Sequence, residues 1–307
     1  MQKSYDLSNQ QLTDLPQGIE QQISLEELDL GGNQLSSLPA AISKLENLHS
    51  LNLYSNRLTS LPESVWGLPR LQKLNISENQ LTSLSDRIGN LAQLEMLDLG
   101  HNLLTSLPES IGNLHNLAFL YLSNNHLTSL PGSLGNLTRL IYLNITDNQL
   151  TTIPDWIGNL TALVELRSYN NLCAALPDSI GDLANLKEIH LMNNQLRSLP
   201  TSIGKLTSLK KLGLMNNLLT SLPESIGNLG SLTDLDLRNN QLVELPMSLG
   251  NLRNLRYLDL RANKLTDLPT SLGELSKLEK LDLRWNKISH IPEQVMHLEG
   301  HGCVIFT

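Results

Sequence analysis

The chain has 307 residues, a formal net charge of −8 and a pI near 5.5. Nucleic-acid backbones and anionic membranes attract basic surfaces, so this acidic balance argues against nucleic acid or an anionic membrane as the main partner. No segment approaches the ~18 uninterrupted apolar residues of a membrane span, and the start, MQKSYDLSNQ, lacks the pattern of a secretory signal. We therefore expect a soluble chain without membrane insertion that is not exported by the Sec route.

Repetition organises the chain from its N-terminal end onward. A first unit carries Gln10 in a slot that asparagine fills every 23 residues afterwards, from Asn33 to Asn286, without insertion or deletion. The final CVIF supplies the first half of one more strand. The spacing predicts one domain over residues 1–307, with an N-terminal capping unit at 1–24, regular repeats at 25–298 and a closing strand at 299–307.

Each slot of a unit such as LEMLDLGHNLLTSLPESIGNLHNL has a physical reason. The L-x-L segment has strand periodicity and sends its leucines inward. The asparagine ends the strand, and its buried side chain can bond backbone groups that the turn leaves unpaired. Proline then stiffens the return segment in twelve of thirteen units, with Ser85 as the exception. The ESIGNL text turns a short helical or irregular segment back toward the next strand.

Successive strands must be parallel and joined by right-handed crossings, so the units stack into a solenoid. The phrase L-x-x-L-x-L-x-x-N-x-L-x-x-L-P-x-x-I-G-x-L resembles the leucine-rich repeat (LRR) family along essentially the whole chain. The expected fold is an α/β repeat solenoid, a right-handed LRR horseshoe with a concave parallel sheet of about thirteen strands and short helical or irregular convex segments. The 23-residue form is similar to intracellular Ras-group scaffold LRR proteins and to bacterial LRR effectors. This resemblance implies a protein partner on the concave face.

The outward-facing strand positions lie six, four and two residues before each repeat asparagine. These 39 positions hold five of the six tyrosines, one of the two phenylalanines and three of the six methionines. Aromatic rings, methionine and arginine are typical of binding surfaces, although aromatic residues also favour strands for their own sake. The predicted partner-binding residues are Met96, Phe119, Tyr121, Tyr142, Arg167, Tyr169, His190, Met192, Met215, Arg238, Arg261 and Arg284.

One repeat departs from the pattern inside this cluster. Ser168 and Cys173 occupy inward slots that hold leucine or isoleucine in the other twelve units. Loss of buried leucine costs about 2–5 kcal/mol per site, so this layer is expected to be thinner or locally reshaped. Either it forms a dent in the contact patch, or it is a drifted repeat that its neighbours tolerate.

Toward the C-terminal end, like charges stack in two adjacent columns. Aspartates lie four residues before the repeat asparagine and arginines two before it, in the sets Asp236, Asp259, Asp282 and Arg238, Arg261, Arg284. In one interpretation the two columns of opposite charge only neutralise each other within the protein. In the other they form a polar arm of the binding site. Trp285 either extends that arm or covers the end of the stack.

The two cysteines, Cys173 and Cys303, lie too many layers apart for a disulfide. Two free thiols and no disulfide-bonded cap favour a reducing compartment. We expect a cytoplasmic location, or the host cytosol if the chain is an injected effector.

The sequence gives little support for an enzymatic function. Stacked carboxylates arise automatically from the repeat, and the sequence has no nucleotide-binding, nucleophile-elbow or zinc-protease motif. His297, His301 and Cys303 have a spacing that a metal could use, but no fourth ligand is evident. We expect no catalytic residue, no metal and no cofactor.

The predicted function is a non-enzymatic protein-interaction module or scaffold, with a bacterial effector role as one setting. The alternative is a structural or self-assembling LRR protein. Val304, Ile305 and Phe306 form a terminal strand whose open edge could support a weak homodimer.

Overall fold

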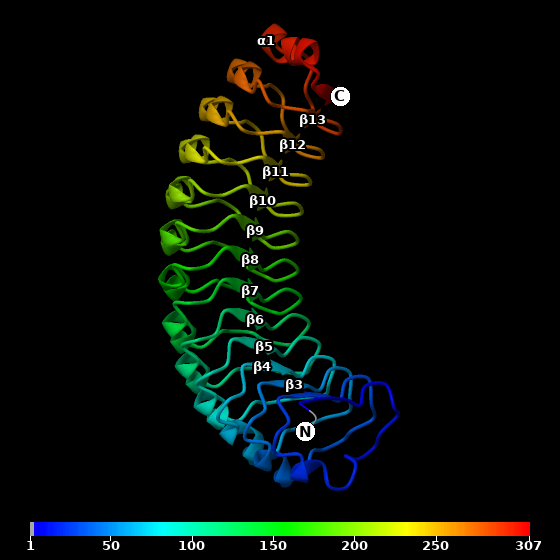
Figure 1. Ribbon diagram of the computed structural model, residues 1–307. Coiled ribbons are helices and arrows are strands. Elements are labelled where there is room, and N and C mark those ends of the chain that lie inside the picture. The colour runs from blue at the N-terminus through cyan, green and yellow to red at the C-terminus, as the bar shows by residue number, and fades with distance from the viewer. Residues whose placement is uncertain (1–2) are drawn as a thin grey trace. The chain divides into compact units, whose positions relative to one another are not determined.

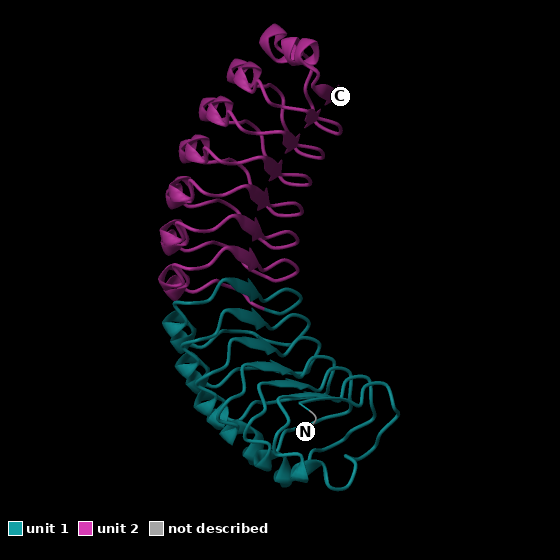
Figure 2. Ribbon diagram, in the orientation of Figure 1, with its two compact units in different colours: residues 1–149 teal, residues 150–307 magenta. Residues whose placement is uncertain are grey.

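The computed structural model describes residues 3–307 in two compact units, residues 1–149 and 150–307 (Figure 2). The first two residues of the predicted N-terminal cap lie outside the described residues. Each unit repeats a short strand and a short 3-10 helix, and in each the strands lie on the inner side of a curve and the 3-10 helices on its outer side (Figure 1). The prediction that 1–307 is one continuous domain stays a prediction.

Unit 1 contains seven strands among its described residues: β1 (Ser4–Asp6), β2 (Glu27–Asp29), β3 (Ser50–Asn52), β4 (Lys73–Asn75), β5 (Met96–Asp98), β6 (Phe119–Tyr121) and β7 (Tyr142–Asn144). Its 3-10 helices are η1 (Ile19–Gln21), η2 (Ala40–Lys44), η3 (Glu63–Gly67), η4 (Asp86–Asn90), η5 (Glu109–Asn113) and η6 (Gly132–Asn136).

Unit 2 contains the strands β8 (Glu165–Arg167), β9 (Glu188–His190), β10 (Lys211–Gly213), β11 (Asp234–Asp236), β12 (Tyr257–Asp259), β13 (Lys280–Asp282) and β14 (Val304–Phe306). Its 3-10 helices are η7 (Asp155–Asn159), η8 (Asp178–Asp182), η9 (Thr201–Lys205), η10 (Glu224–Asn228), η11 (Met247–Asn251), η12 (Thr270–Glu274) and η13 (His297–His301). One turn of α-helix, α1 (Glu293–Met296), precedes η13.

Within each unit the strands pair in chain order, parallel and in register. Residues 23 apart are therefore direct neighbours, as in the pairs Met96–Phe119 and Arg167–His190. The two units together hold fourteen strands in the described part of the chain, against about thirteen expected, because the closing CVIF segment completes β14. The right-handed, parallel LRR architecture predicted from the repeat is confirmed, and its expected short convex segments are 3-10 helices.

The repeat asparagine ties neighbouring layers together, as expected. Asn102 donates through Nδ2 to the carbonyl oxygens of Ile76 (3.0 Å) and Leu99 (3.1 Å), and its Oδ1 accepts from the Leu81 amide (3.0 Å). These partners include backbone groups of the preceding repeat. The same pattern recurs around Asn217 in unit 2. An asparagine side chain thus satisfies buried backbone groups that leucine packing alone would leave unpaired.

The residue before each repeat asparagine adopts a left-handed backbone conformation. Examples are Asn124 with φ 54°, Ala262 with φ 53° and Trp285 with φ 62°. Asparagine and glycine tolerate this region, whereas bulky side chains rarely enter it. The turn is therefore imposed by the layer geometry, and the repeat phrase alone does not reveal it.

The core of each unit is a column of buried leucine and isoleucine side chains. Glycines in the I-G step let the 3-10 helices approach one another. A Cβ on Gly227 would collide with the backbone oxygen of Ser248 in the next repeat. Where Ser85 replaces the usual proline, its hydroxyl oxygen accepts a hydrogen bond from the Arg87 amide (3.2 Å) and caps η4.

The irregular repeat keeps the regular backbone. β8 has the usual three residues and pairs in register with β9, and the Cys173 amide donates to Asn194 Oδ1 at 3.0 Å, as leucine does in other repeats. Ser168 and Cys173 are both fully buried. The local reshaping expected for this layer is therefore not seen in its backbone, because the strand pairing and the Asn194 bond that hold the other layers are kept. That the layer is thinner stays a prediction.

Candidate functional site

The outward face of unit 1 gathers the predicted aromatic residues. Met96, Phe119 and Tyr142 occupy one row on β5, β6 and β7, with Phe119 paired to its two neighbours. The Tyr121 and Tyr142 ring centroids lie 4.9 Å apart with the planes tilted by 38°. Phe119 is 39% exposed although it sits in a regular strand. These four side chains form an aromatic surface on unit 1.

The outward face of unit 2 carries the other predicted residues. Arg167 and His190 are register partners on β8 and β9. Tyr169, Met192 and Met215 follow the strands β8, β9 and β10, and all five side chains are partly exposed. The structure thus places four members of the predicted cluster on unit 1 and five on unit 2, each on its strand face. Their binding role stays a prediction.

A hollow of about 310 Å³ opens on the strand face of unit 2. Its floor lies over Gly213, the one outward position of β10 without a side chain, and its rim includes Met192, Lys211 and Tyr257. A Cβ built on Gly213 would lie only 2.7 Å from the Met192 sulfur. The hollow therefore exists because glycine replaces the Asp or Asn that most repeats carry in this column.

The two charged columns of unit 2 form one continuous ladder of ion pairs, made of Asp236, Asp259, Asp282, Arg238, Arg261 and Arg284. Each arginine binds the aspartate of its own strand closely, as in the 2.6 Å contact between Arg261 and Asp259. Arg261 also reaches the next aspartate, Asp282, at 3.4 Å. The arginine donors are thus largely engaged within the protein. This supports charge compensation as the main role of the ladder, and partner binding by these arginines stays a prediction.

Asp282 ends the ladder with no exposed side-chain surface. Although burial raises the pKa of Asp282, the hydrogen bond from Arg284 and the charge of Arg261 outweigh it and hold that pKa below its ordinary value. The Phe306 ring of β14 lies against the same group, with the Arg284 guanidinium 5.0 Å from its centroid. Trp285 is 70% exposed, so it does not cover the end of the stack as one sequence alternative had it.

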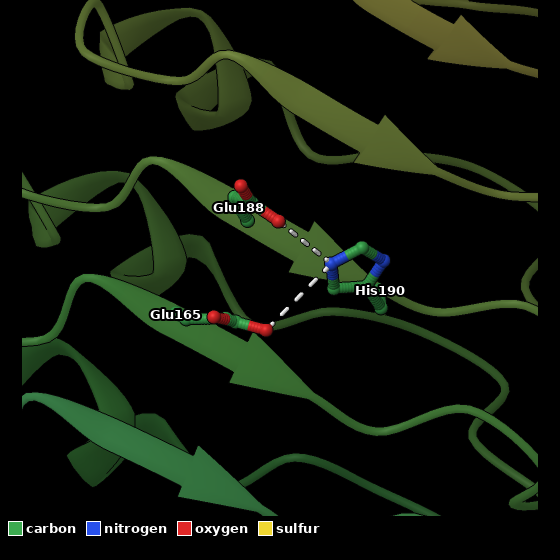
Figure 3. A group of neighbouring side chains, drawn as sticks. All are labelled: Glu165, Glu188 and His190. Carbon is green, nitrogen blue, oxygen red and sulfur yellow. Dashed lines mark hydrogen bonds and ion pairs between the residues drawn. The ribbon is translucent and has the colours of Figure 1, made fainter.

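A second charged group on unit 2 was not singled out from the sequence. Glu165, Glu188 and His190 extend from β8 and β9 toward one another (Figure 3). His190 Nε2 lies 3.3 Å from Glu188 Oε2 and 3.9 Å from Glu165 Oε1. The signal was present in the columns, because Glu165 and Glu188 stack and His190 stands two residues further along β9.

Two cations neutralise this group from its flanks. Arg167 Nε donates to Glu165 Oε1 at 2.5 Å, and Lys211 Nζ lies 3.0 Å from Glu188 Oε1. Although burial raises the pKa of Glu188, the hydrogen bonds from Lys211 and His190 outweigh it and hold that pKa below its ordinary value. The same contact raises the pKa of Lys211.

The thiols are free and buried, as expected. Burial raises the pKa of Cys173 to about 11 and that of Cys303 to about 11, so both stay protonated near neutral pH. Ser168 Oγ lies near the Cys173 thiol but makes no well-formed hydrogen bond among the described residues. His297 and His301 are exposed while Cys303 is buried, and in the described part of the chain they do not converge as metal ligands would.

None of the helices in residues 3–307 has the length and apolar character needed to cross a membrane. The chain matches two family descriptions. "Leucine-rich repeat region" covers residues 79–191, and "Leucine rich repeat" covers residues 3–58, 23–81, 184–242, 231–288 and 253–299. The comparison with curated proteins gives no match.

Solved structures with the same fold are numerous, and three illustrate their range. An LRR protein of Leptospira interrogans is 35% identical, with a TM-score of 0.89, over 98% of this chain and 83% of that one. The Arabidopsis receptor kinase HAESA, solved with the peptide hormone IDA and a co-receptor, is 32% identical, with a TM-score of 0.74, over 92% of this chain and 54% of that one. YopM from Yersinia enterocolitica is 30% identical, with a TM-score of 0.70, over 95% of this chain and 62% of that one. The chain therefore spans most of the Leptospira protein but less than two thirds of the other two.

Proposed function

Because the chain belongs to the leucine-rich repeat family, whose members typically act as non-enzymatic interaction scaffolds, we propose that it is a non-enzymatic module that binds a protein partner. The partner binds the outward strand faces of its units. The residues proposed to contact it are the twelve predicted from the outward columns, with the aromatic surface of unit 1 as the main apolar anchor.

One observation carries this proposal. Large apolar side chains that ordinarily avoid solvent are held on regular strands with their rings partly exposed, as Phe119, Tyr121 and Tyr142 are. Rings of this kind dominate binding energy at protein interfaces. The hollow over Gly213 adds a recess that a partner side chain can enter on unit 2. The HAESA structure, solved with a peptide hormone, is an LRR relative bound to a polypeptide.

The experiment compares the wild-type chain with Tyr142→Ala combined with Tyr169→Ala as bait in cytosolic extracts, with quantitative mass spectrometry of the difference. A matched control replaces two exposed apolar residues outside the strands, Ile23→Ala with Met247→Ala. We expect the tyrosine variant to recover at least about tenfold less of the partner than the wild type, as expected when residues that dominate binding are removed. Its circular dichroism spectrum and melting temperature should be unchanged. A partner that binds both variants and the wild type equally would overturn the proposal.

A second function, self-assembly, is favoured by one feature of unit 2. β14 pairs only with β13 among the described strands, and Val304 on it is 52% exposed. An open strand edge is a template for pairing with a second copy. Static light scattering tests this: a dimer that disappears on removal of residues 303–307 supports it, and a monomer at high concentration excludes it.

We further propose that the protein acts in a reducing cytosol, or in the host cytosol if it is an injected bacterial effector. Two buried thiols without a disulfide support a reducing compartment. Fractionation of the source cells, and of host cells exposed to them, decides between the two locations. Recovery only from an oxidising extracellular fraction would exclude both.

A further inference from the structure

The group formed by Glu165, Glu188 and His190 on unit 2 has the geometry of a metal-binding site (Figure 3). One ligand atom from each residue lies within 4.8 Å of the other two. Zinc sites have metal–ligand bonds of about 2.0 to 2.2 Å, which place tetrahedral ligand atoms about 3.3 to 3.6 Å apart. The distance of 3.3 Å between His190 Nε2 and Glu188 Oε2 already lies in this range. His190 Nε2 and Glu165 Oε1 are 3.9 Å apart, and a small rotation of the Glu165 side chain would bring them into it.

The outward columns make this group stand out from the rest of the strand faces. Like charges directly opposed on neighbouring strands repel, and Glu165 and Glu188 are the one adjacent acidic pair in their column. His190 is the one histidine among the 39 outward positions. In the ladder of unit 2, by contrast, every aspartate has an arginine on its own strand. Glu165 has Arg167 on its own strand, but Glu188 shares its strand only with His190 and takes its cation, Lys211, from β10.

Access to the group is open on two sides. The flanking side chains of Arg167 and Lys211 are 40% and 49% exposed, so both can swing toward water when a cation enters. On the far side of the imidazole, Gly213 presents no side chain, and His190 lines the hollow above it. The carboxylates and the imidazole are about one fifth to one quarter exposed. They are therefore ordered by the sheet but reachable from solvent.

We propose that Glu165, Glu188 and His190 bind a divalent transition-metal ion, with zinc as the first candidate. An imidazole nitrogen with two carboxylate oxygens suits zinc, copper or nickel, whereas calcium and magnesium prefer oxygen ligands alone. Three protein ligands leave one coordination position open to solvent. This inference does not depend on the proposed partner binding, because the metal requires only unit 2.

The test titrates zinc chloride into the full chain at neutral pH in a non-chelating buffer, followed by calorimetry. We expect one ion per chain, with affinity lowered at least about tenfold by His190→Asn and by Glu188→Gln, as loss of one of three ligands implies. Cobalt substituted for zinc should give the visible absorption of a four-coordinate site. Circular dichroism checks that both variants keep the fold.

Two further variants make the result unambiguous. Lys211→Met removes a competing cation and should raise zinc affinity about threefold, in line with the weak coupling of exposed ion pairs. If Glu165, Glu188 and His190 served only as a structural ion-pair group, Lys211→Met would not raise the affinity for zinc. The control His297→Asn with His301→Asn alters two exposed histidines elsewhere in unit 2 and should leave binding unchanged. The proposal is overturned if the wild type does not bind zinc, if His190→Asn binds zinc as tightly as the wild type, or if the control loses binding.

Discussion

The outward faces of the two units are built on the same backbone, but the most prominent side-chain group differs between them. Unit 1 presents rings on β6 and β7, whereas unit 2 carries a ladder of paired aspartates and arginines along β11 to β13. Both have three-residue strands in register, and both carry the asparagine bonds that tie the layers. The difference teaches that the repeat sets the scaffold, while the three outward positions of each strand are free to set the chemistry.

The column four residues before the repeat asparagine shows how neighbouring outward residues change the pKa of an aspartate. Asp98 of unit 1 and Asp282 of unit 2 occupy the same slot of their repeats. Burial raises the pKa of Asp98, and the hydrogen bond from the Gly100 amide offsets this only in part. At Asp282 the arginines reverse the balance and lower the pKa. In the same slot, the fold therefore favours the charged form of Asp282 and disfavours the charged form of Asp98.

The largest expected effect tests what the units share. Asn102→Ala in unit 1 and Asn217→Ala in unit 2 should each lower the free energy of unfolding by at least about 3 kcal/mol, because several buried backbone groups lose their partner. Thermal melts followed by circular dichroism measure the loss. The exposed Asn228→Ala in η10 is the control and should change stability by less than about 0.5 kcal/mol. Unequal losses in the two units would show that their scaffolds differ after all.

The next effect should separate the units. Asp282→Asn is expected to lower the free energy of unfolding by about 1–3 kcal/mol at neutral pH, because Arg284 and Arg261 lose a buried charged acceptor. Asp98→Asn should leave stability unchanged or raise it by less than about 1 kcal/mol, because it removes a charge that burial disfavours. Urea titration of both variants provides the comparison. A loss at Asp98 as large as that at Asp282 would contradict the role given to the arginines.

The pH dependence follows from the direction of the Asp282 shift. Its folded pKa lies below the ordinary value of 3.8. The charged form therefore stabilises the fold above that ordinary value, and the contribution disappears as pH falls through the folded pKa. Wild type and Asp282→Asn should differ in melting temperature at neutral pH, and the difference should shrink below pH 3.8 and disappear once the pH is under the folded pKa of Asp282. A difference that stays constant down to the acid limit would rule out this linkage.

A smaller effect concerns the irregular repeat of unit 2. Ser168→Leu with Cys173→Leu should raise the unfolding midpoint, because two more buried leucine side chains would fill a layer whose backbone is regular. The expected gain is about 1–2 kcal/mol, less than the cost of removing two buried leucines, because leucine packs imperfectly among neighbours set around small side chains. Differential scanning calorimetry measures it. Loss of stability instead would mean that the layer has no room for leucine. A change of partner affinity in the same variant would identify the repeat as part of the contact surface.

The smallest expected change in stability is at the hollow. Gly213→Asn restores the residue type of Asn52, Asn75 and Asn144 in the same column. The Cβ of the new side chain would come too close only to the flexible Met192 side chain, so the free energy of unfolding should change by less than about 0.5 kcal/mol. Partner affinity should nevertheless fall, because the recess is filled. Unchanged affinity would remove the hollow from the contact surface and leave the aromatic surface of unit 1 as its centre.

The strand positions, the inward leucines and the role of the repeat asparagine could be predicted from the sequence because the 23-residue period is unbroken. In a parallel sheet in register, that period makes residues one repeat apart direct neighbours. Every predicted contact residue accordingly lies on the outward side of a strand or two residues after its end. The left-handed turn residues were not predicted, since Trp285 and Ala262 are not residues that favour positive φ.

Only the tertiary structure shows which of its neighbours each outward side chain binds. The columns bring Arg261 near both Asp259 and Asp282, but the torsions of a long side chain determine that it binds the two together. In the same way, the columns place Glu165, Glu188 and His190 side by side, and only the orientation of the imidazole turns Nε2 toward both carboxylates. A backbone period fixes where side chains begin. Packing and charge in three dimensions determine where their ends meet.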